Sequence, residues 1–139
     1  MKIGLLILIG IVLGYIVKWM VNWLAIDNFI MSRKNFFLEA VGAIMVTWSA
    51  VNLGIEEAII FSIIALTLAG ISVIDFHTFE IPLIFIIIGV VASVAGIFLK
   101  VILLSSAFWG IFVGALIPMA IMLIMWGITK RQGMGYGDI

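Results

Sequence analysis

The sequence has 139 residues, of which 66% are hydrophobic and 10% are charged, and its formal net charge is zero. An ordinary soluble domain carries about 25% charged residues, and a soluble domain of this size leaves much of its surface in water. We therefore expect an integral membrane protein. The balanced charge gives no sign of a nucleic-acid partner. The sequence contains no cysteine, which excludes disulfides, thiolate metal sites and a cysteine nucleophile.

The chain contains five apolar stretches, each close to the roughly 20 residues that cross a bilayer as a helix. They are continuously apolar, whereas the strands of a membrane barrel alternate. The sequence thus predicts an all-α polytopic membrane protein, a single domain over residues 1–139, with five transmembrane helices and short loops. The expected spans are residues 3–26, 36–54, 58–75, 81–99 and 105–128. Because the first stretch continues well beyond a signal-peptide core, we expect it to be a retained helix.

The basic residues predict how the chain is oriented in the membrane. With five spans, one membrane face collects most of the lysines and arginines, and cytoplasmic loops are enriched in these residues. That face carries Lys18, Arg33, Lys34, Lys130 and Arg131, and the other carries Lys2 and Lys100. We expect the N-terminus outside, residues 129–139 as a cytoplasmic loop, and a location in the plasma or inner membrane of the cell. The long stem of Lys18, late in the first span, is expected to snorkel to the head groups.

Two aspartates fall at the predicted cytoplasmic face. Asp75 ends the third span and Asp138 follows the fifth, so the topology allows the two carboxylates to meet. A carboxylate costs about 2.5 to 3.5 kcal/mol at the centre of a membrane helix and less near the interface. Position alone is therefore also consistent with an ordinary interfacial acid at Asp75. Gly133, Gly135 and Gly137 precede Asp138 and permit close backbone approach to another chain, although a glycine-rich end alone would favour a flexible tail.

The two segments together resemble the type IV prepilin peptidases. The pattern Asp-x-x-Thr-x-x-Ile-Pro is followed by Gly-x-Gly-Asp, and the string Gly-Met-Gly-Tyr-Gly-Asp-Ile at residues 133–139 is similar to the second aspartate motif of that family. The residues that carry the resemblance are Asp75, Thr78, Ile81, Pro82, Gly135, Gly137 and Asp138. The resemblance covers the chain from about Phe36 onward.

The resemblance implies an intramembrane aspartyl endopeptidase with Asp75 and Asp138 as the catalytic dyad. Such an enzyme removes the basic leader of pilin-like precursors at the cytoplasmic edge of the bilayer, without a metal or another cofactor. Two adjacent carboxylates share one proton, so the ionised one can activate water while the protonated one polarises the scissile carbonyl. The expected partners are the precursor and the lipid bilayer, and no nucleic acid.

Two further acids are candidates for binding the basic leader. Glu39 lies near the start of the second span and Glu80 lies close to Asp75. The plainer interpretations are a pairing of Glu39 with Arg33 or Lys34, and a solvated loop acid at Glu80.

The sequence departs from the family pattern in two places, and these departures leave alternative functions open. Residues 27–35 replace a large cysteine-rich cytoplasmic loop, so we expect no methyltransferase activity. The family continues into further helices after the second motif, so we also expect the chain to be a truncated piece. The alternatives are therefore a catalytically incomplete fragment or a non-enzymatic membrane assembly protein. A presenilin-type protease is disfavoured because Ile74 stands where that group has tyrosine, and a transporter because spans three to five carry no polar site at mid-bilayer.

Overall fold

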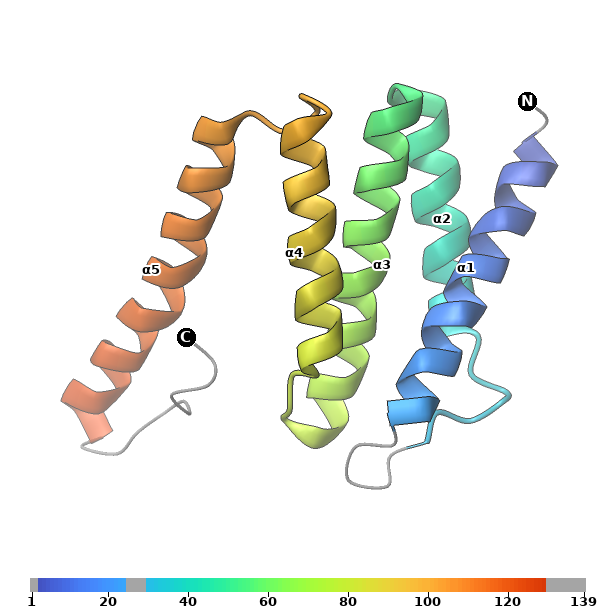
Figure 1. Cartoon of the computed structure of the whole chain (residues 1–139). Helices are drawn as coiled ribbons and strands as arrows, with labels where there is room; N and C mark the ends of the chain where they lie inside the picture. The colour runs from blue at the N-terminus through green and yellow to red at the C-terminus, as the bar shows by residue number, and fades with distance from the viewer. Residues whose placement is uncertain (1–2, 25–29, 130–139) are drawn as a thin grey trace. The chain divides into compact units, whose positions relative to one another are not determined.

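A computed structural model describes residues 3–24 and 30–129 of the chain, and all regular structure in them is helical (Figure 1). The prediction of an all-α protein is therefore confirmed for this part of the chain. The chain divides into two compact units, Met1–Val101 and Ile102–Ile139. Among the described residues, the first unit contains four helices and the second contains one. The helices are α1 (Ile3–Leu24), α2 (Phe37–Asn52), α3 (Ile55–Thr78), α4 (Leu83–Phe98) and α5 (Leu104–Thr129).

The helices follow the predicted apolar stretches in number and order, but α3 is longer than the span at 58–75. It begins at Ile55, and the side chain of Glu57 accepts a hydrogen bond of 3.2 Å from the Gly54 N–H, which caps the helix. It ends at Thr78, where Phe79 adopts a left-handed conformation with φ 55°. Hydropathy stops at the first charge, whereas the helix continues until its backbone is capped. Asp75 consequently lies inside the last turn of α3.

Glycines bring α1 and α2 into backbone contact. A Cβ atom at Gly10 would overlap the carbonyl of Gly42, and one at Gly14 would overlap the carbonyl of Leu38. Small residues permit this close approach between apolar helices. The two helices therefore pack in one fixed register, which sets where the side chains at their ends meet.

The core of the first unit lies toward the end that carries Asp75. One cluster of buried side chains joins the C-terminal halves of α1 and α3 to the beginnings of α2 and α4. Its members are Val21, Met31, Leu38, Val73, Ile74 and Phe85. Gly70 leaves room for Phe85, because a Cβ at that glycine would lie 2.9 Å from the ring. The core thereby fixes the end of α3 against the other three helices of the unit.

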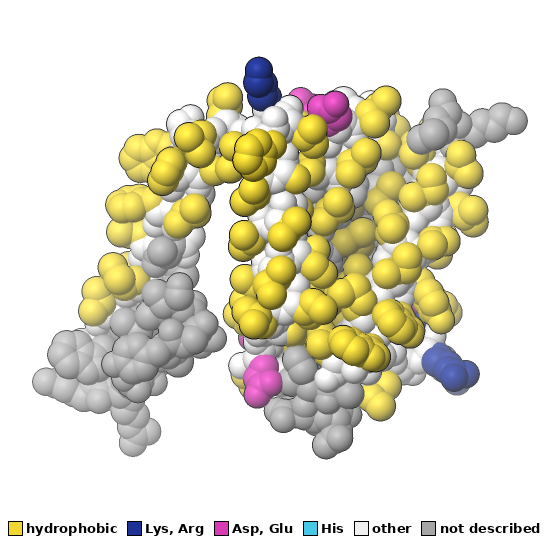
Figure 2. Space-filling model, viewed as in Figure 1, with side chains coloured by type: hydrophobic (Ala, Val, Ile, Leu, Met, Phe, Trp, Pro, Cys, Tyr) yellow, Lys and Arg dark blue, Asp and Glu magenta, His cyan; other side chains and the backbone are white. Residues whose placement is uncertain are grey.

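Many large hydrophobic side chains are exposed on the helices, and those on the face seen in Figure 2 are drawn in yellow. In the described residues, α1 and α3 are long and apolar enough to cross a membrane by length and composition. Within their most apolar windows, 28% of the residues of α1 and 39% of those of α3 are buried. Fully buried residues are therefore a minority in both windows.

Candidate functional site

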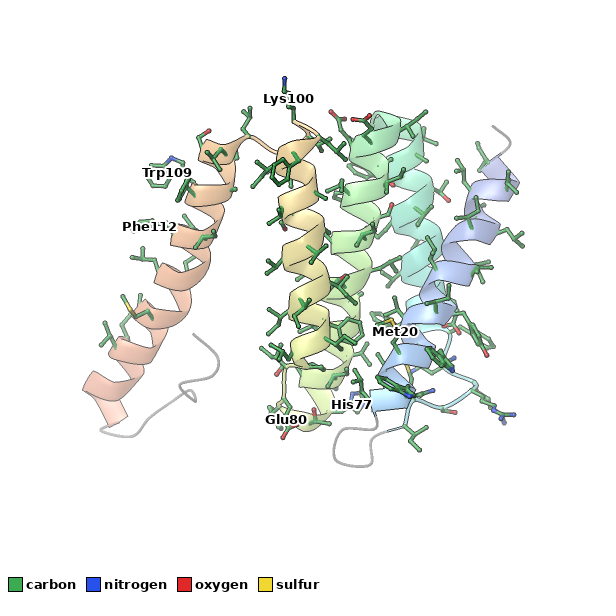
Figure 3. The ribbon with its side chains drawn as sticks, viewed as in Figure 1. Met20, His77, Glu80, Lys100, Trp109 and Phe112 are labelled. Carbon is green, nitrogen blue, oxygen red and sulfur yellow. The ribbon has the colours of Figure 1, made fainter. Side chains whose placement is uncertain are left out.

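One end of the first unit gathers the polar groups that the sequence singled out. The C-terminal ends of α1 and α3 and the N-terminal ends of α2 and α4 lie there (lower end in Figure 1). Figure 3 labels His77 and Glu80 at this end and Lys100 at the opposite one. We refer to it as the Asp75 end.

The side chain of Asp75 is exposed, whereas its backbone is held by a hydrogen bond and by its buried neighbour Ile74. Its carboxylate makes no hydrogen bond or ion pair with another residue that the structure describes. Its carbonyl accepts a hydrogen bond of 2.9 Å from the Phe79 N–H. The preceding residue, Ile74, is almost fully buried in the core cluster. The structure thus holds the carboxylate at the surface of the Asp75 end and leaves both its oxygens open to a ligand or to water.

The rest of the first motif forms the turn between α3 and α4. The Thr78 hydroxyl donates to the Ile74 carbonyl at 3.0 Å, which seals the last turn of α3. Ile81 is partly exposed, and Pro82 is the N-cap residue of α4, with its carbonyl accepting from the Phe85 N–H at 3.1 Å. A proline suits this place because its missing N–H leaves no donor unpaired at a helix start. Thr78 and Pro82 therefore shape the connection between α3 and α4 beside Asp75, and Ile81 lies exposed within it.

His77 and Glu80 flank this turn. Nδ1 of His77 lies 2.8 Å from the Val73 carbonyl oxygen, and its ring meets Phe76 edge to face at 5.3 Å. The Glu80 side chain is exposed beyond the end of α3 (Figure 3). Among the described residues, no three acidic, histidine or cysteine side chains are grouped as metal ligands would be.

The second motif lies outside the described residues. Gly133, Gly135, Gly137 and Asp138 all fall within 130–139, so the structure describes the first aspartate motif without its predicted partner.

A buried ion pair, which sequence reasoning missed, lies at the same end of the unit. Nζ of Lys18 is 2.9 Å from Oε1 of Glu39, and the two residues are 4% and 7% exposed. The ammonium also donates to the backbone carbonyls of Arg33, at 3.4 Å, and Asn35. The expectation that Lys18 snorkels to the head groups is wrong, because Gly14 brings this face of α1 against the start of α2.

The pair also changes the interpretation of Glu39. The sequence suggested Arg33 and Lys34 as partners of Glu39. In the structure Glu39 pairs with Lys18, and Arg33 contributes only its backbone carbonyl, which accepts a hydrogen bond from Lys18. Lys18 follows Gly14 by one turn, so both occupy the same face of α1. That spacing was the only signal in the sequence that Lys18 faces a neighbouring helix.

Asn22 reinforces the link between α1 and α2. Its side-chain oxygen accepts from the Met31 N–H at 2.7 Å, and its amide donates to the Met31 carbonyl at 3.4 Å. Together with Lys18, it ties residues 31–35 to the C-terminal half of α1. The backbone that leads into Glu39 is thus held at several points.

Comparison with models of protein families, with curated proteins and with solved structures gave no match.

Proposed function

We propose that the chain is a membrane-embedded aspartyl endopeptidase, with Asp75 and Asp138 as its dyad, that cleaves the basic leader from pilin-like precursors at the cytoplasmic face. The observation that carries the proposal is the setting of Asp75. Its carboxylate is exposed and unpaired among the described residues, at the end of an apolar helix, and the Thr78–Pro82 turn of the same motif shapes its surroundings. The resemblance of both motifs to prepilin peptidases supplies the reaction.

The outward apolar surface supports the membrane placement. Exposed leucine, isoleucine, valine and phenylalanine side chains follow one another along α1 and α4. Keeping such a surface in water costs about 25 cal/mol for each Å² of apolar area, and a bilayer removes that cost. Helix α2 has 16 residues, and with Phe36 and Leu53 at its ends it covers about 27 Å, close to the roughly 30 Å of the hydrocarbon core. The short links between α1, α2, α3 and α4 support a polytopic arrangement, because short links make sequential helices antiparallel neighbours.

The distribution of basic residues supports a cytoplasmic position for the Asp75 end. Arg33 and Lys34 are exposed in the link before α2, at the same end of the unit as Asp75. Lysine and arginine are enriched in cytoplasmic loops. In this orientation, the basic leader of a precursor would lie beside Asp75 while its apolar segment lies in the bilayer.

The proposed chemistry needs only the two carboxylates and water. One carboxylate is protonated and polarises the scissile carbonyl, while the other is ionised and takes a proton from the attacking water. The C–N bond of the tetrahedral intermediate then breaks. The carboxyl group that took the proton from water delivers it to the leaving amine. Glu80 is the exposed acid that would attract the basic leader, because Glu39 is already paired with Lys18.

The direct test mixes the protein with a pilin-type precursor in membranes, beside the variants Asp75→Asn and Asp138→Asn. We expect each substitution to abolish cleavage, because neither amide can exchange the proton. Glu56→Gln, an exposed acid in the first turn of α3 at the opposite end of the unit, is the matched control and should cleave normally. Wild-type cleavage by both aspartate variants would refute the dyad. A folded wild-type chain without cleavage would instead favour the non-enzymatic alternative.

A further inference from the structure

One buried carboxylate oxygen has no hydrogen-bond partner among the residues that the structure describes. Oε2 of Glu39 and Oγ1 of Thr47 are the buried side-chain atoms without a hydrogen bond among the described residues. The Thr47 hydroxyl can rotate to donate to a carbonyl of the preceding turn, as helical threonines commonly do. Oε2 cannot find a partner by rotation in this way, because an ionised carboxylate only accepts hydrogen bonds. The ammonium of Lys18 donates to the other oxygen, Oε1. Oε2 therefore calls for a donor from outside the described residues.

An apolar groove runs along α1 and α2 and reaches Glu39. It consists of two adjoining pockets of 510 Å³ and 460 Å³, which share Ala43. Glu39 lines the first pocket, and Thr47 and Val51 line the second. The distance along the helix from Glu39 to Val51 is about 18 Å, similar to the roughly 15 Å of one bilayer leaflet. The groove thus has the length and the apolar character of a site for one acyl chain.

The charges at the Glu39 end of the groove favour an anion. Lys18 balances Glu39, whereas Arg33 and Lys34 have exposed side chains in the adjoining link and no carboxylate partner among the described residues. The Arg33 backbone lies beside the ion pair, because its carbonyl accepts from Lys18. A ligand for this place would carry a negative group for the two cations and a neutral donor for Oε2, since a second ammonium would be repelled by Lys18.

We propose that the α1–α2 groove binds an anionic phospholipid with a hydroxylated head group, whose hydroxyl donates to Oε2 of Glu39. The phosphate lies near Arg33 and Lys34, and one acyl chain follows the groove over Ala40 and Ala43. Phe36 lines the same pocket, is 67% exposed, and its ring centroid lies 5.4 Å from Nζ of Lys18. In this proposal the Phe36 ring moves aside, so that the head-group hydroxyl reaches the buried Oε2. This inference rests on the membrane placement proposed above and is independent of the peptidase reaction.

The test uses the full chain in detergent, stripped of lipid and titrated with phosphatidylglycerol or with phosphatidylethanol. Both lipids carry one negative charge, but only the first has head-group hydroxyls. Native mass spectrometry and thermal unfolding report binding. We expect phosphatidylglycerol to bind about tenfold more tightly, as a hydrogen bond to a charged group implies. Equal affinity for the two lipids would overturn the proposal.

Two variants distinguish the contribution of the head-group hydroxyl to lipid binding from that of the groove. The double variant Lys18→Met with Glu39→Met replaces the ion pair by apolar side chains and should bind both lipids equally. Ala40→Leu, at an exposed position that lines the same pocket as Glu39, fills this end of the groove and should weaken both lipids at least threefold. Val91→Leu, on an exposed face of α4, is the matched control and should bind like the wild type. If Ala40→Leu binds like Val91→Leu, the acyl chain does not lie in this groove and the proposal fails.

Discussion

Lys18 and Glu39, which are far apart in the sequence, form an ion pair of 2.9 Å across the α1–α2 contact, and both are more than nine-tenths buried. The ammonium also holds two carbonyls of the link that leads into α2. Because its hydrogen bonds satisfy the lysine within the protein, the charge needs no contact with the head groups. The ion pair therefore stabilises the contact between α1 and α2.

Breaking this pair from one side should be costly. Lys18→Met leaves the Glu39 carboxylate buried without its counter-charge, which typically destabilises a protein by about 3 to 5 kcal/mol. Replacing both residues by methionine should recover most of that loss, because no unpaired charge remains. Denaturant titration in detergent, followed by the circular dichroism of the helices, measures both effects. A double variant as unstable as the single one would show that the carbonyl contacts of Lys18 matter more than its charge.

The glycine contact between α1 and α2 should tolerate no side chain. Gly14→Ala places a Cβ against the Leu38 carbonyl, and we expect a loss of about 1 to 3 kcal/mol through overpacking. Gly4→Ala in the same helix is the control, because a Cβ there meets nothing within 4 Å, and alanine is the better helix former. The difference in unfolding midpoint between the two variants checks the contact. Equal midpoints would contradict the packing of α1 on α2.

The end of α3 contains backbone strain next to Asp75. Phe79 has φ 55°, a conformation in which glycine avoids the steric cost of a Cβ. Phe79→Gly should therefore raise the free energy of unfolding by up to about 1 kcal/mol. Lys100, with φ 60° after α4, offers a matched substitution, and Lys100→Gly should stabilise similarly. Val94→Gly, at an exposed position inside α4, should destabilise instead. Thermal melting distinguishes the three variants, and a lower melting temperature for Phe79→Gly would exclude the strain.

Glu80 gives a prediction for the proposed enzyme. Glu80→Gln should raise the KM for a basic precursor about two- to fivefold and leave kcat unchanged, because an exposed charge contributes about 0.2 to 1 kcal/mol to binding. The difference from the wild type should shrink at high salt. Initial rates at two ionic strengths measure both effects. An unchanged KM at low salt would remove Glu80 from substrate binding.

Hydropathy predicted the helices because apolar runs and charged breaks follow the chain in one dimension. It missed the ends of α3, because Glu57 and Phe79 cap that helix beyond the apolar run. It also misplaced Lys18, since the burial of a lysine depends on which helix its face meets, and Gly14 decides that in three dimensions. For the candidate site, the sequence picked out both aspartates, whereas the exposed setting of Asp75 became visible only in the folded unit.

The backbone contact of Gly10 with Gly42 has a mechanical consequence. Two helices separated by side chains can slide as those side chains change rotamer, but here no side chain lies between the backbones. Moving α1 along α2 would require the helices to separate and re-engage about one turn away, some 5.4 Å along the axis. The helices α1 and α2 thus form a rigid pair. Any movement that opens the Asp75 end therefore has to come from other parts of the chain.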